Sequence, residues 1–222
     1  MRRKKKDLRR DQFVDTIEKV LKWGLSHRDR AITIVVGIIA AVVIGYSLLT
    51  PKENFNPQAE LILFQGKELI GMGKFDEAEQ LLRYLVQNFG TTSSGARGHY
   101  YLGIICSATG RYNDAIKEFD LFLSSIKKSY FLRPSAYIGR GSAREMIGDL
   151  EGAYEDYKKA AESNTPVSPI ARLQMGRVAG ALGRYEEAKE ILQKLSEENK
   201  GTVIGDDALL FLGYLEAKLP SD

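Results

Sequence analysis

The sequence of 222 residues has little of what enzymes commonly use for nucleophilic catalysis or metal binding. It holds one cysteine, Cys106, and two histidines. A single cysteine can form neither an intramolecular disulfide nor a metal cluster, and its neighbours Ile104 and Ile105 favour a small buried side chain. No strand pattern is present, and no glycine-rich phosphate loop follows a strand. We therefore expect an all-α protein without catalytic, cofactor-binding or metal-binding residues, and not an enzyme.

Most of the chain carries no excess of positive charge. Residues 1–30 hold eleven Lys or Arg against five Asp or Glu, which leaves 21 basic and 24 acidic residues for the remainder. A nucleic-acid groove would need a basic face in that remainder. The basic head could contact nucleic acid only as a tail, and the apolar run that follows it favours a membrane function instead. We expect no nucleic-acid partner.

The apolar run covers residues 31–50, twenty positions without a charge, of which eleven are Ile, Val or Leu. A helix of that length spans about 30 Å, the thickness of a hydrocarbon core. The eleven aliphatic residues favour insertion by roughly 3–6 kcal/mol. A signal peptide has a shorter apolar region of roughly 7–15 residues and a small-x-small cleavage site, which is poor here. The run predicts an uncleaved transmembrane signal anchor.

The basic residues set the expected orientation of this anchor. Only Lys52 follows the run before the repeats begin, so the positive-inside rule keeps the N-terminus in the cytoplasm and sends the rest across. In a bacterium this is a single-pass inner-membrane protein with a periplasmic C-terminal domain. Within the head, residues 11–25 fit either an amphipathic helix on the anionic inner leaflet or a solvated stub.

One six-residue phrase occurs four times after the anchor. GKFDEA begins at Gly73, GRYNDA at Gly110 and GRYEEA at Gly183, and a weaker copy, GDLEGA, begins at Gly148. The intervals between successive copies are 37, 38 and 35 residues. A phrase repeated at near-constant spacing indicates a structural unit that stacks on copies of itself.

A second glycine precedes each phrase by seven residues, inside a helical apolar pattern. The glycines at this register, called the register glycines below, are Gly66, Gly103, Gly141, Gly176 and a fifth, Gly213. Glycine in a helix interior costs about 1 kcal/mol relative to alanine. Five such costs at one register indicate close approach of a neighbouring helix. Each unit is therefore predicted to be two antiparallel helices, joined by a tight turn at the glycine that begins the phrase.

These residues resemble the tetratricopeptide repeat (TPR) family. The match consists of the register glycine, the Gly-x-aromatic-x-x-Ala phrase and a pair of apolar residues in the second helix, which are Leu82 and Leu85, Phe119 and Phe122, Tyr157 and Ala160, or Leu192 and Leu195. It covers about 59–219, as four helix pairs and a final unpaired helix near 206–219. The resemblance implies an all-α solenoid over 59–222, which a linker, 51–58, joins to the anchor. Periods of 35–38 exceed the family's typical ~34 and imply longer loops.

The resemblance also implies a concave groove that binds extended peptides along the first helix of each pair. Carried over by register, the groove residues are Leu63, Lys67, Ile70, Arg97, Tyr100, Ile104, Ile138, Met146, Leu173 and Arg177. Such a surface suits aliphatic or aromatic segments of varied sequence. For each residue, packing between helices is an equally good interpretation.

The last helix is apolar nearly all round over residues 208–215. A terminal repeat normally presents a polar outer face. We therefore expect Phe211, Tyr214 and Leu215 to form a partner surface, covered by a bound segment or by another copy of the chain. An imperfect cap on a stable stack is the alternative.

The layout of basic head, single span and TPR body is similar to the bacterial ancillary translocon subunit family, inner-membrane proteins beside the Sec channel. It implies a chaperone or adaptor that receives unfolded or extended segments of secreted or outer-membrane proteins. The implied partners are the Sec translocon and periplasmic chaperones. The alternative is a structural scaffold for an envelope assembly machine (cell wall, division or outer membrane). A third interpretation is an organellar adaptor in a eukaryote, inserted the opposite way.

Overall fold

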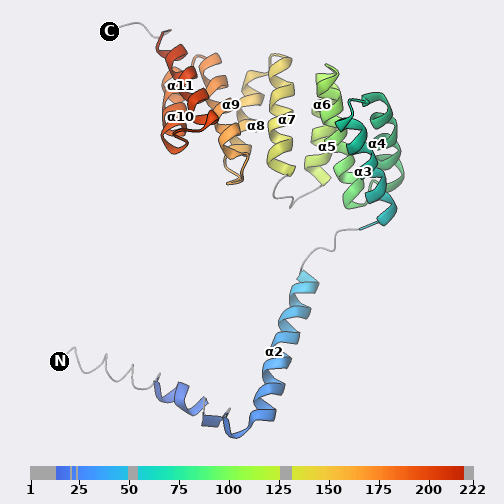
Figure 1. Cartoon of the computed structure of the whole chain (residues 1–222), viewed down its shortest axis with the longest axis vertical. Coiled ribbons are helices and arrows are strands. Elements are labelled where there is room, and N and C mark those ends of the chain that lie inside the picture. Colours follow the sequence, from blue (N-terminus) through green and yellow to red (C-terminus); the bar gives the residue numbers. More distant parts are fainter. Residues whose placement is uncertain (1–13, 21, 24, 50–54, 126–131, 218–222) are drawn as a thin grey trace, which may run out of the picture. The chain divides into compact units, whose positions relative to one another are not determined.

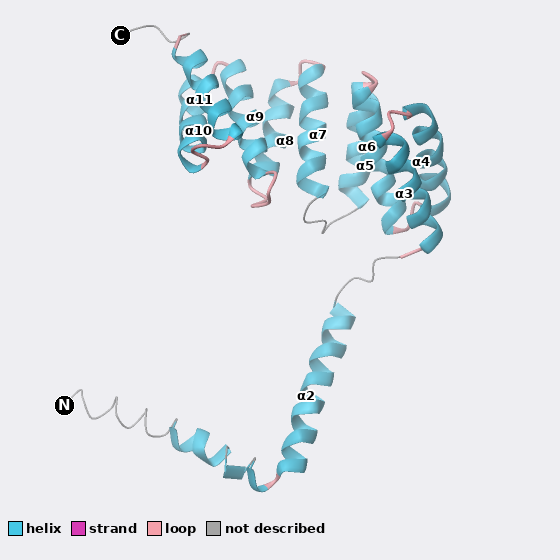
Figure 2. Ribbon diagram, viewed as in Figure 1, coloured by secondary structure: helices cyan, strands magenta, loops and turns pink. Residues whose placement is uncertain are grey.

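The computed structural model describes residues 14–20, 22–23, 25–49, 55–125 and 132–217. The chain divides into two compact units, Met1–Lys52 and Glu53–Asp222. Every regular element in the described residues is a helix (Figure 2). The expected all-α class is confirmed.

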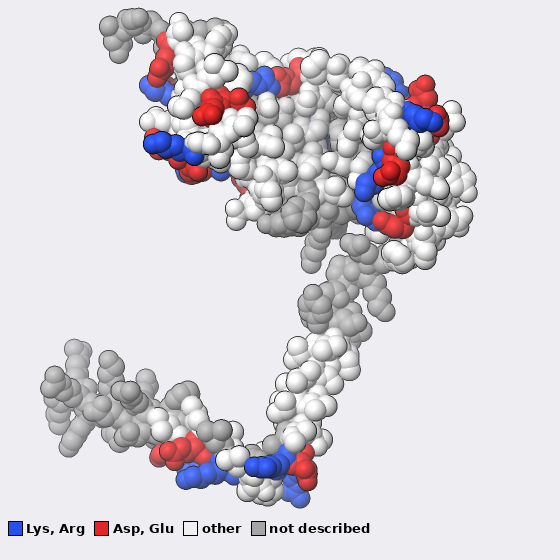
Figure 3. All heavy atoms as spheres, viewed as in Figure 1, with Lys and Arg blue, Asp and Glu red and all other residues white. Residues whose placement is uncertain are grey.

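The first unit contains the long helix α2 (Arg28–Leu49). Its described apolar side chains between Ile32 and Ile44 are exposed, and Figure 3 shows it without charged groups beyond its first turns. Among the residues that the structure describes, none forms a helix that combines the length and the apolar character of a membrane span. The anchor predicted over 31–50 is therefore not supported by the structure and stays a prediction. Residues 14–20 are also helical. Of the predicted amphipathic segment, 11–25, residues 11–13, 21 and 24 lie outside the described residues.

The second unit is a stack of helix pairs (Figure 1). The pairs are α3 (Pro57–Gly71) with α4 (Phe75–Phe89), α5 (Ser93–Ala108) with α6 (Tyr112–Ser125), α7 (Leu132–Met146) with α8 (Leu150–Ala161), and α9 (Ser168–Ala181) with α10 (Tyr185–Glu198). The final helix, α11 (Val203–Glu216), has no second helix after it in the described part of the chain. The predicted solenoid of four pairs and a terminal helix is confirmed.

Local capping explains where several of these helices begin. The Asn56 side chain accepts a hydrogen bond from the Ala59 backbone N–H at 3.0 Å, and Pro57 occupies the first turn of α3, where its missing N–H costs nothing. The helix therefore starts inside the segment 51–58 that the sequence indicates as a linker. Thr92 and Thr202 cap α5 and α11 in the same way.

The glycine that begins each phrase forms the turn inside its helix pair. Gly73, Gly110, Gly148 and Gly183 all have φ between +73° and +84°, the left-handed region that a Cβ disfavours. Two residues later the second helix begins, at the aromatic or leucine position of the phrase. The expected tight turn is therefore confirmed in all four pairs.

The register glycines lie where the two helices of a pair are closest. A Cβ on Gly66 would be 2.7 Å from Leu82 Cδ2, and one on Gly176 would be 2.8 Å from Leu192 Cδ2. The corresponding contacts in the other pairs are Gly103 with the Phe119 ring at 2.8 Å and Gly141 with the Tyr157 ring at 3.0 Å. Close approach is confirmed for these four. The fifth, Gly213, has no atom within 4 Å of a built Cβ, because no second helix packs there in the described residues.

Three hydrophobic clusters run along the stack and draw only on its own residues. They are centred on α3–α5, on α5–α7 and on α8–α11, and their largest fully buried side chains are Phe119, Phe122 and Tyr157. The paired apolar residues predicted for each second helix are all fully or almost fully buried. Since each cluster lies between residues 59 and 215, residues 53–222 contain their own core.

Ion pairs join successive units across 32 or 33 residues of sequence. Arg111 donates to both carboxylate oxygens of Glu79, Arg177 to those of Glu145, and Arg184 to Glu151. The hydrogen bonds from Arg111, followed by those from Arg83, lower the pKa of Glu79 to about 2, against the opposing effect of burial. These charged contacts link neighbouring units in addition to the apolar core.

The register glycines predict opposite effects for the same substitution at two positions. Gly103→Ala is expected to destabilise residues 53–222 by about 1–3 kcal/mol, because the Phe119 ring lies against Gly103 on one side and Gly139 on the other and cannot retreat. Gly213→Ala is expected to stabilise by up to about 1 kcal/mol, because alanine favours the helix and meets no atom. Urea unfolding followed by circular dichroism measures both. If both substitutions changed the free energy of unfolding by the same amount, helix propensity alone would govern this register.

Glu79→Gln tests the ion pairs by their pH dependence. The folded pKa of Glu79, about 2, lies below its ordinary value of 4.5, so its contribution is fully present above about pH 4.5 and is lost as the pH falls toward 2. The difference in unfolding free energy between wild type and variant is expected to be largest at pH 7 and to shrink between pH 5 and 2.5. All other carboxylates are present in both proteins, so their pH-dependent contributions cancel in this difference. A difference in unfolding free energy that does not change with pH would contradict the lowered pKa of Glu79 in the folded protein.

Candidate functional site

The first helices of the pairs form the inner layer of the solenoid. Helix α5 contacts both α3 and α7, and α11 contacts α9. In the described residues no contact of similar extent joins α7 to α9 or the second helices of neighbouring pairs. Elements on the inner side of a curved stack approach one another most closely. The predicted groove residues lie on the first helices and therefore belong to the layer on the inner side.

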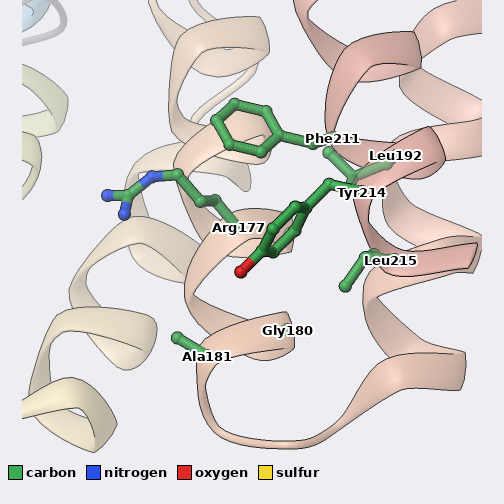
Figure 4. Close-up of a pocket in the computed structure, with 8 residues that line it drawn as sticks. Arg177, Gly180, Ala181, Leu192, Phe211, Tyr214 and Leu215 are labelled. Atoms are coloured by element: carbon green, nitrogen blue, oxygen red, sulfur yellow. The ribbon is translucent and has the colours of Figure 1, made fainter. Parts of the chain in front are cut away.

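A pocket of about 360 Å³ opens between α9 and α11 (Figure 4). Figure 4 shows the rings of Phe211 and Tyr214 directed from α11 toward α9, and Leu215 lies behind them. The other lining residues are Gly176, Arg177, Gly180, Ala181 and Leu192. The volume lies near the lower end of the range for ligand pockets, roughly 300–1,000 Å³, and suits one large side chain of a bound segment.

Two small residues at the end of α9 create this space. Gly180 and Ala181 follow the register glycine Gly176 by four and five positions, so they lie one turn further along the helix. A Cβ on Gly180 would be 2.8 Å from Leu215 Cδ2, which shows how closely α11 approaches there. A larger residue at Gly180 would meet Leu215 and narrow the pocket.

The charge of Arg177, at the side of the pocket, is already satisfied. Its Nη1 and Nη2 donate to Glu145 Oε1 and Oε2 at 2.6 and 2.5 Å, and its Nε donates to Gln174 Oε1 at 2.9 Å. The Tyr157 hydroxyl also donates to Glu145 Oε2 at 3.2 Å. The hydrogen bonds to Glu145 are the largest cause that raises the pKa of Arg177. Arg177 therefore forms a fixed polar edge to an otherwise apolar pocket.

Several predicted groove residues pack into the core. Leu63 and Leu173 are only 2 % and 7 % exposed, so they contribute packing and not a surface. Tyr100 and Ile104 are half-buried against the α5–α7 cluster, where the Tyr100 ring packs edge-on to Phe119 with ring centroids 6.0 Å apart.

The remaining predicted groove residues differ in how far they reach the surface. Ile70 and Ile138 are half-buried against the neighbouring clusters. Lys67 and Met146 are exposed. Arg97 donates to Glu60 at 2.5 Å and so links α5 to α3.

The structure brings together residues that the sequence assigned to two surfaces. Arg177 comes from the predicted groove, and Phe211, Tyr214 and Leu215 from the predicted partner surface, yet all four line one pocket. The sequence analysis missed Gly180 and Ala181. Their signal was available, since two adjacent small residues stand one turn after a register glycine. Use of the pocket and of the other groove residues as a binding site stays a prediction.

The described residues provide no metal site. No group of three His, Cys, Asp or Glu side chains among them is placed to hold a metal ion. His99 Nδ1 lies 2.7 Å from Glu118 Oε2, and Cys106 is fully buried. Burial is the main cause that raises the pKa of the Cys106 thiol.

Family comparison assigns the repeats. Two family models described as tetratricopeptide repeat match residues 65–130 and 148–203, which together make up more than half of the chain. The chain contains tetratricopeptide repeats. This repeat typically forms a non-catalytic scaffold for protein interactions, so the chain has the architecture of a protein-binding module. None of the curated proteins matches it at a significant level.

Solved structures show the same TPR fold at low sequence identity. YrrB, described as a TPR protein with an unusual peptide-binding site, is 18 % identical with a TM-score of 0.59, over 71 % of this chain and 75 % of its own. A TPR protein from Parabacteroides merdae is 20 % identical with a TM-score of 0.61, over 73 % and 62 %. A putative kinesin light chain from Podosopora anserina with TPR-like repeats is 15 % identical with a TM-score of 0.61, over 72 % and 86 %. At these identities the likeness establishes the fold alone.

Proposed function

We propose that the TPR unit binds extended segments of other proteins along its inner layer and holds one large apolar side chain in the α9–α11 pocket. The pocket carries this proposal, because it is concave, lies on the layer of first helices and is lined mainly by apolar and small residues. The peptide-binding site described for YrrB, a structural neighbour, is consistent with this use of the fold.

The chemistry of the pocket indicates what kind of segment fits. Arg177 is paired with Glu145, so the pocket offers no unmatched positive charge that would select an acidic side chain. Phe211, Tyr214 and Leu215 instead favour an aromatic or branched aliphatic side chain. The pocket has few polar groups that could select one particular sequence. This suits a receptor for many different unfolded chains.

The proposal includes a membrane tether over residues 31–50, with the N-terminus in the cytoplasm and the TPR unit in the periplasm of a bacterium. Its support is the uncharged twenty-residue run and the excess of basic residues before the run. Within residues 31–50 the structure describes only the side chains of 32–45, so the span itself rests on sequence.

Within this setting the chain would act as a chaperone or adaptor at the Sec translocon and receive secreted or outer-membrane proteins. The support is the layout of head, span and TPR unit, together with a pocket of low sequence selectivity. A scaffold for an envelope assembly machine is the second candidate. The specific observation in its favour is an exposed apolar face on α11, which could hold one folded partner.

Site-specific photo-crosslinking in cells tests the proposal in the full-length chain. A photoreactive amino acid at Ala181, exposed at the pocket, is expected to capture many different secreted proteins. The matched control is the same amino acid at Leu121, which is 49 % exposed on the second helix α6 and is expected to capture far fewer. Tyr214→Asp in the Ala181-labelled chain should reduce capture several-fold.

The captured proteins separate the candidates. Many transient clients from the periplasm and outer membrane support the chaperone, whereas one stoichiometric folded partner indicates the scaffold. Capture of cytosolic proteins alone would contradict the proposed location. Equal capture at Ala181 and Leu121 would contradict use of the pocket.

A further inference from the structure

Successive first helices face each other at equivalent positions of the repeat. These positions are the fourth residue after the register glycine of one helix and the first residue after the register glycine of the next. At α9–α11 they are Gly180 and Tyr214, which both line the pocket. At α7–α9 they are Glu145 and Arg177, which form an ion pair. The four places where one first helix faces the next, from α3–α5 to α9–α11, are called the groove junctions below.

The groove junctions differ in chemistry along the stack. By the same register, the α3–α5 junction has Ile70 and Ile104, and the α5–α7 junction has Ser107 and Ser142. The order from α3 to α11 is therefore an aliphatic pair, two hydroxyls, an ion pair and an apolar pocket. The inner layer is apolar at its two end junctions and polar at the two junctions between them.

The α3–α5 junction presents a second apolar surface, called the α3–α5 seat below and formed by Ile70, Gly71, Tyr101 and Ile104. The three large side chains are half-buried, so part of each reaches the surface. Gly71 is exposed, and no atom lies within 4 Å of a Cβ built on it. It stands at the register of Ala181, which lines the pocket at the other end. The seat therefore has room for an apolar side chain of a bound segment.

The two central junctions favour polar groups instead. The ion pair of Glu145 and Arg177 occupies the register that Gly180 leaves open one unit later. An apolar side chain placed there would remove water from charged groups without replacing their hydrogen bonds, which is unfavourable. Ser142 is exposed and offers a hydroxyl that can both donate and accept a hydrogen bond.

We propose that the inner layer holds an extended segment with two large apolar side chains about nine residues apart, one in the pocket and one on the α3–α5 seat, with polar residues between them. This inference rests on the proposed function and adds the pattern of the bound segment to it. Three steps from one first helix to the next separate the two end junctions. Packed helices lie about 8–10 Å apart, so the two apolar sites are on the order of 30 Å apart. An extended chain advances about 3.3 Å per residue and covers that distance with about nine residues.

An exposed cation borders the α3–α5 seat. Lys67 Nζ lies 5.9 Å from the centroid of the Tyr101 ring, whereas Arg177 at the pocket is already bonded to Glu145. An acidic residue next to an anchor is therefore favoured at the α3–α5 end and not at the pocket end.

Fluorescence anisotropy of labelled peptides with residues 53–222, which contain their own core, tests this pattern. The peptides consist of Ser, Gly and Gln and carry either one Trp or two Trp placed about nine or about five residues apart. The nine-residue spacing is expected to bind about tenfold tighter than the single Trp, because its second Trp reaches the second site on the same chain. The five-residue spacing spans only about 17 Å, too short for both sites. It is expected to stay within about twofold of the single-Trp peptide.

Two variants locate the two anchors. Gly71→Asp places a charge in the α3–α5 seat, and its Cβ meets no atom, so the fold is expected to persist. This variant should lower the affinity for the nine-residue spacing to that for the single Trp and leave the single-Trp affinity unchanged. Tyr214→Asp should weaken the binding of both peptides. Leu121→Asp, on the second helix α6, is the matched control and should change neither affinity, and circular dichroism verifies that all three variants stay helical.

The outcomes separate this inference from the proposed function. A nine-residue spacing that binds no tighter than the five-residue spacing would overturn the two-anchor pattern, and so would a gain in affinity that survives Gly71→Asp. In both cases the proposed function stands if Tyr214→Asp weakens the binding of the single-Trp peptide. No binding of any peptide, or no effect of Tyr214→Asp on any of them, would overturn the use of the pocket and this inference together.

Discussion

The contact between a glycine of one helix and a large side chain of the next is the interaction on which this structure depends. It recurs in all four pairs, with Leu82, Phe119, Tyr157 and Leu192 as the large partners. Each glycine gives up helix propensity, and the close approach of the second helix compensates by burying a leucine or an aromatic ring. Because the register repeats, each pair has the same shape and can stack on the next.

That stacking determines where binding can occur. Helix α5 touches both α3 and α7, and α9 touches α11, so these first helices lie on the inner layer. The pocket forms at the end of this layer because α11 packs on α9 beside two small residues, Gly180 and Ala181. Helix α11 therefore completes the pocket with Phe211, Tyr214 and Leu215.

The sequence was sufficient to predict the fold because its signals are local and repeated. A turn glycine such as Gly73 and a register glycine such as Gly66 can each be recognised within a few residues, and five registers make chance agreement improbable. The start of α3 was less certain, since the cap at Asn56 lies before the first recognisable repeat. The anchor has a strong sequence signal, but the described residues provide no support for it.

The candidate site was harder to predict because it depends on contacts between units. The pairing of Arg177 with Glu145 spans 32 residues, so no local pattern reveals that the arginine is neutralised. Leu63 and Tyr100 share one register, yet the first is buried and the second half-exposed, because the neighbouring helices differ. The joining of Arg177 and Tyr214 in one pocket likewise requires knowing how α11 packs on α9.

Amide hydrogen exchange on residues 53–222, at concentrations where the protein is monomeric, tests the central claim most directly. Helices α3 and α11 are both end helices, but α3 has its glycine contact with a second helix and α11 has none. The account predicts that the amides around Gly66 exchange more slowly than those around Gly213. Equal protection, or slower exchange around Gly213, would show that the glycine contact is not what holds the helices of this protein together.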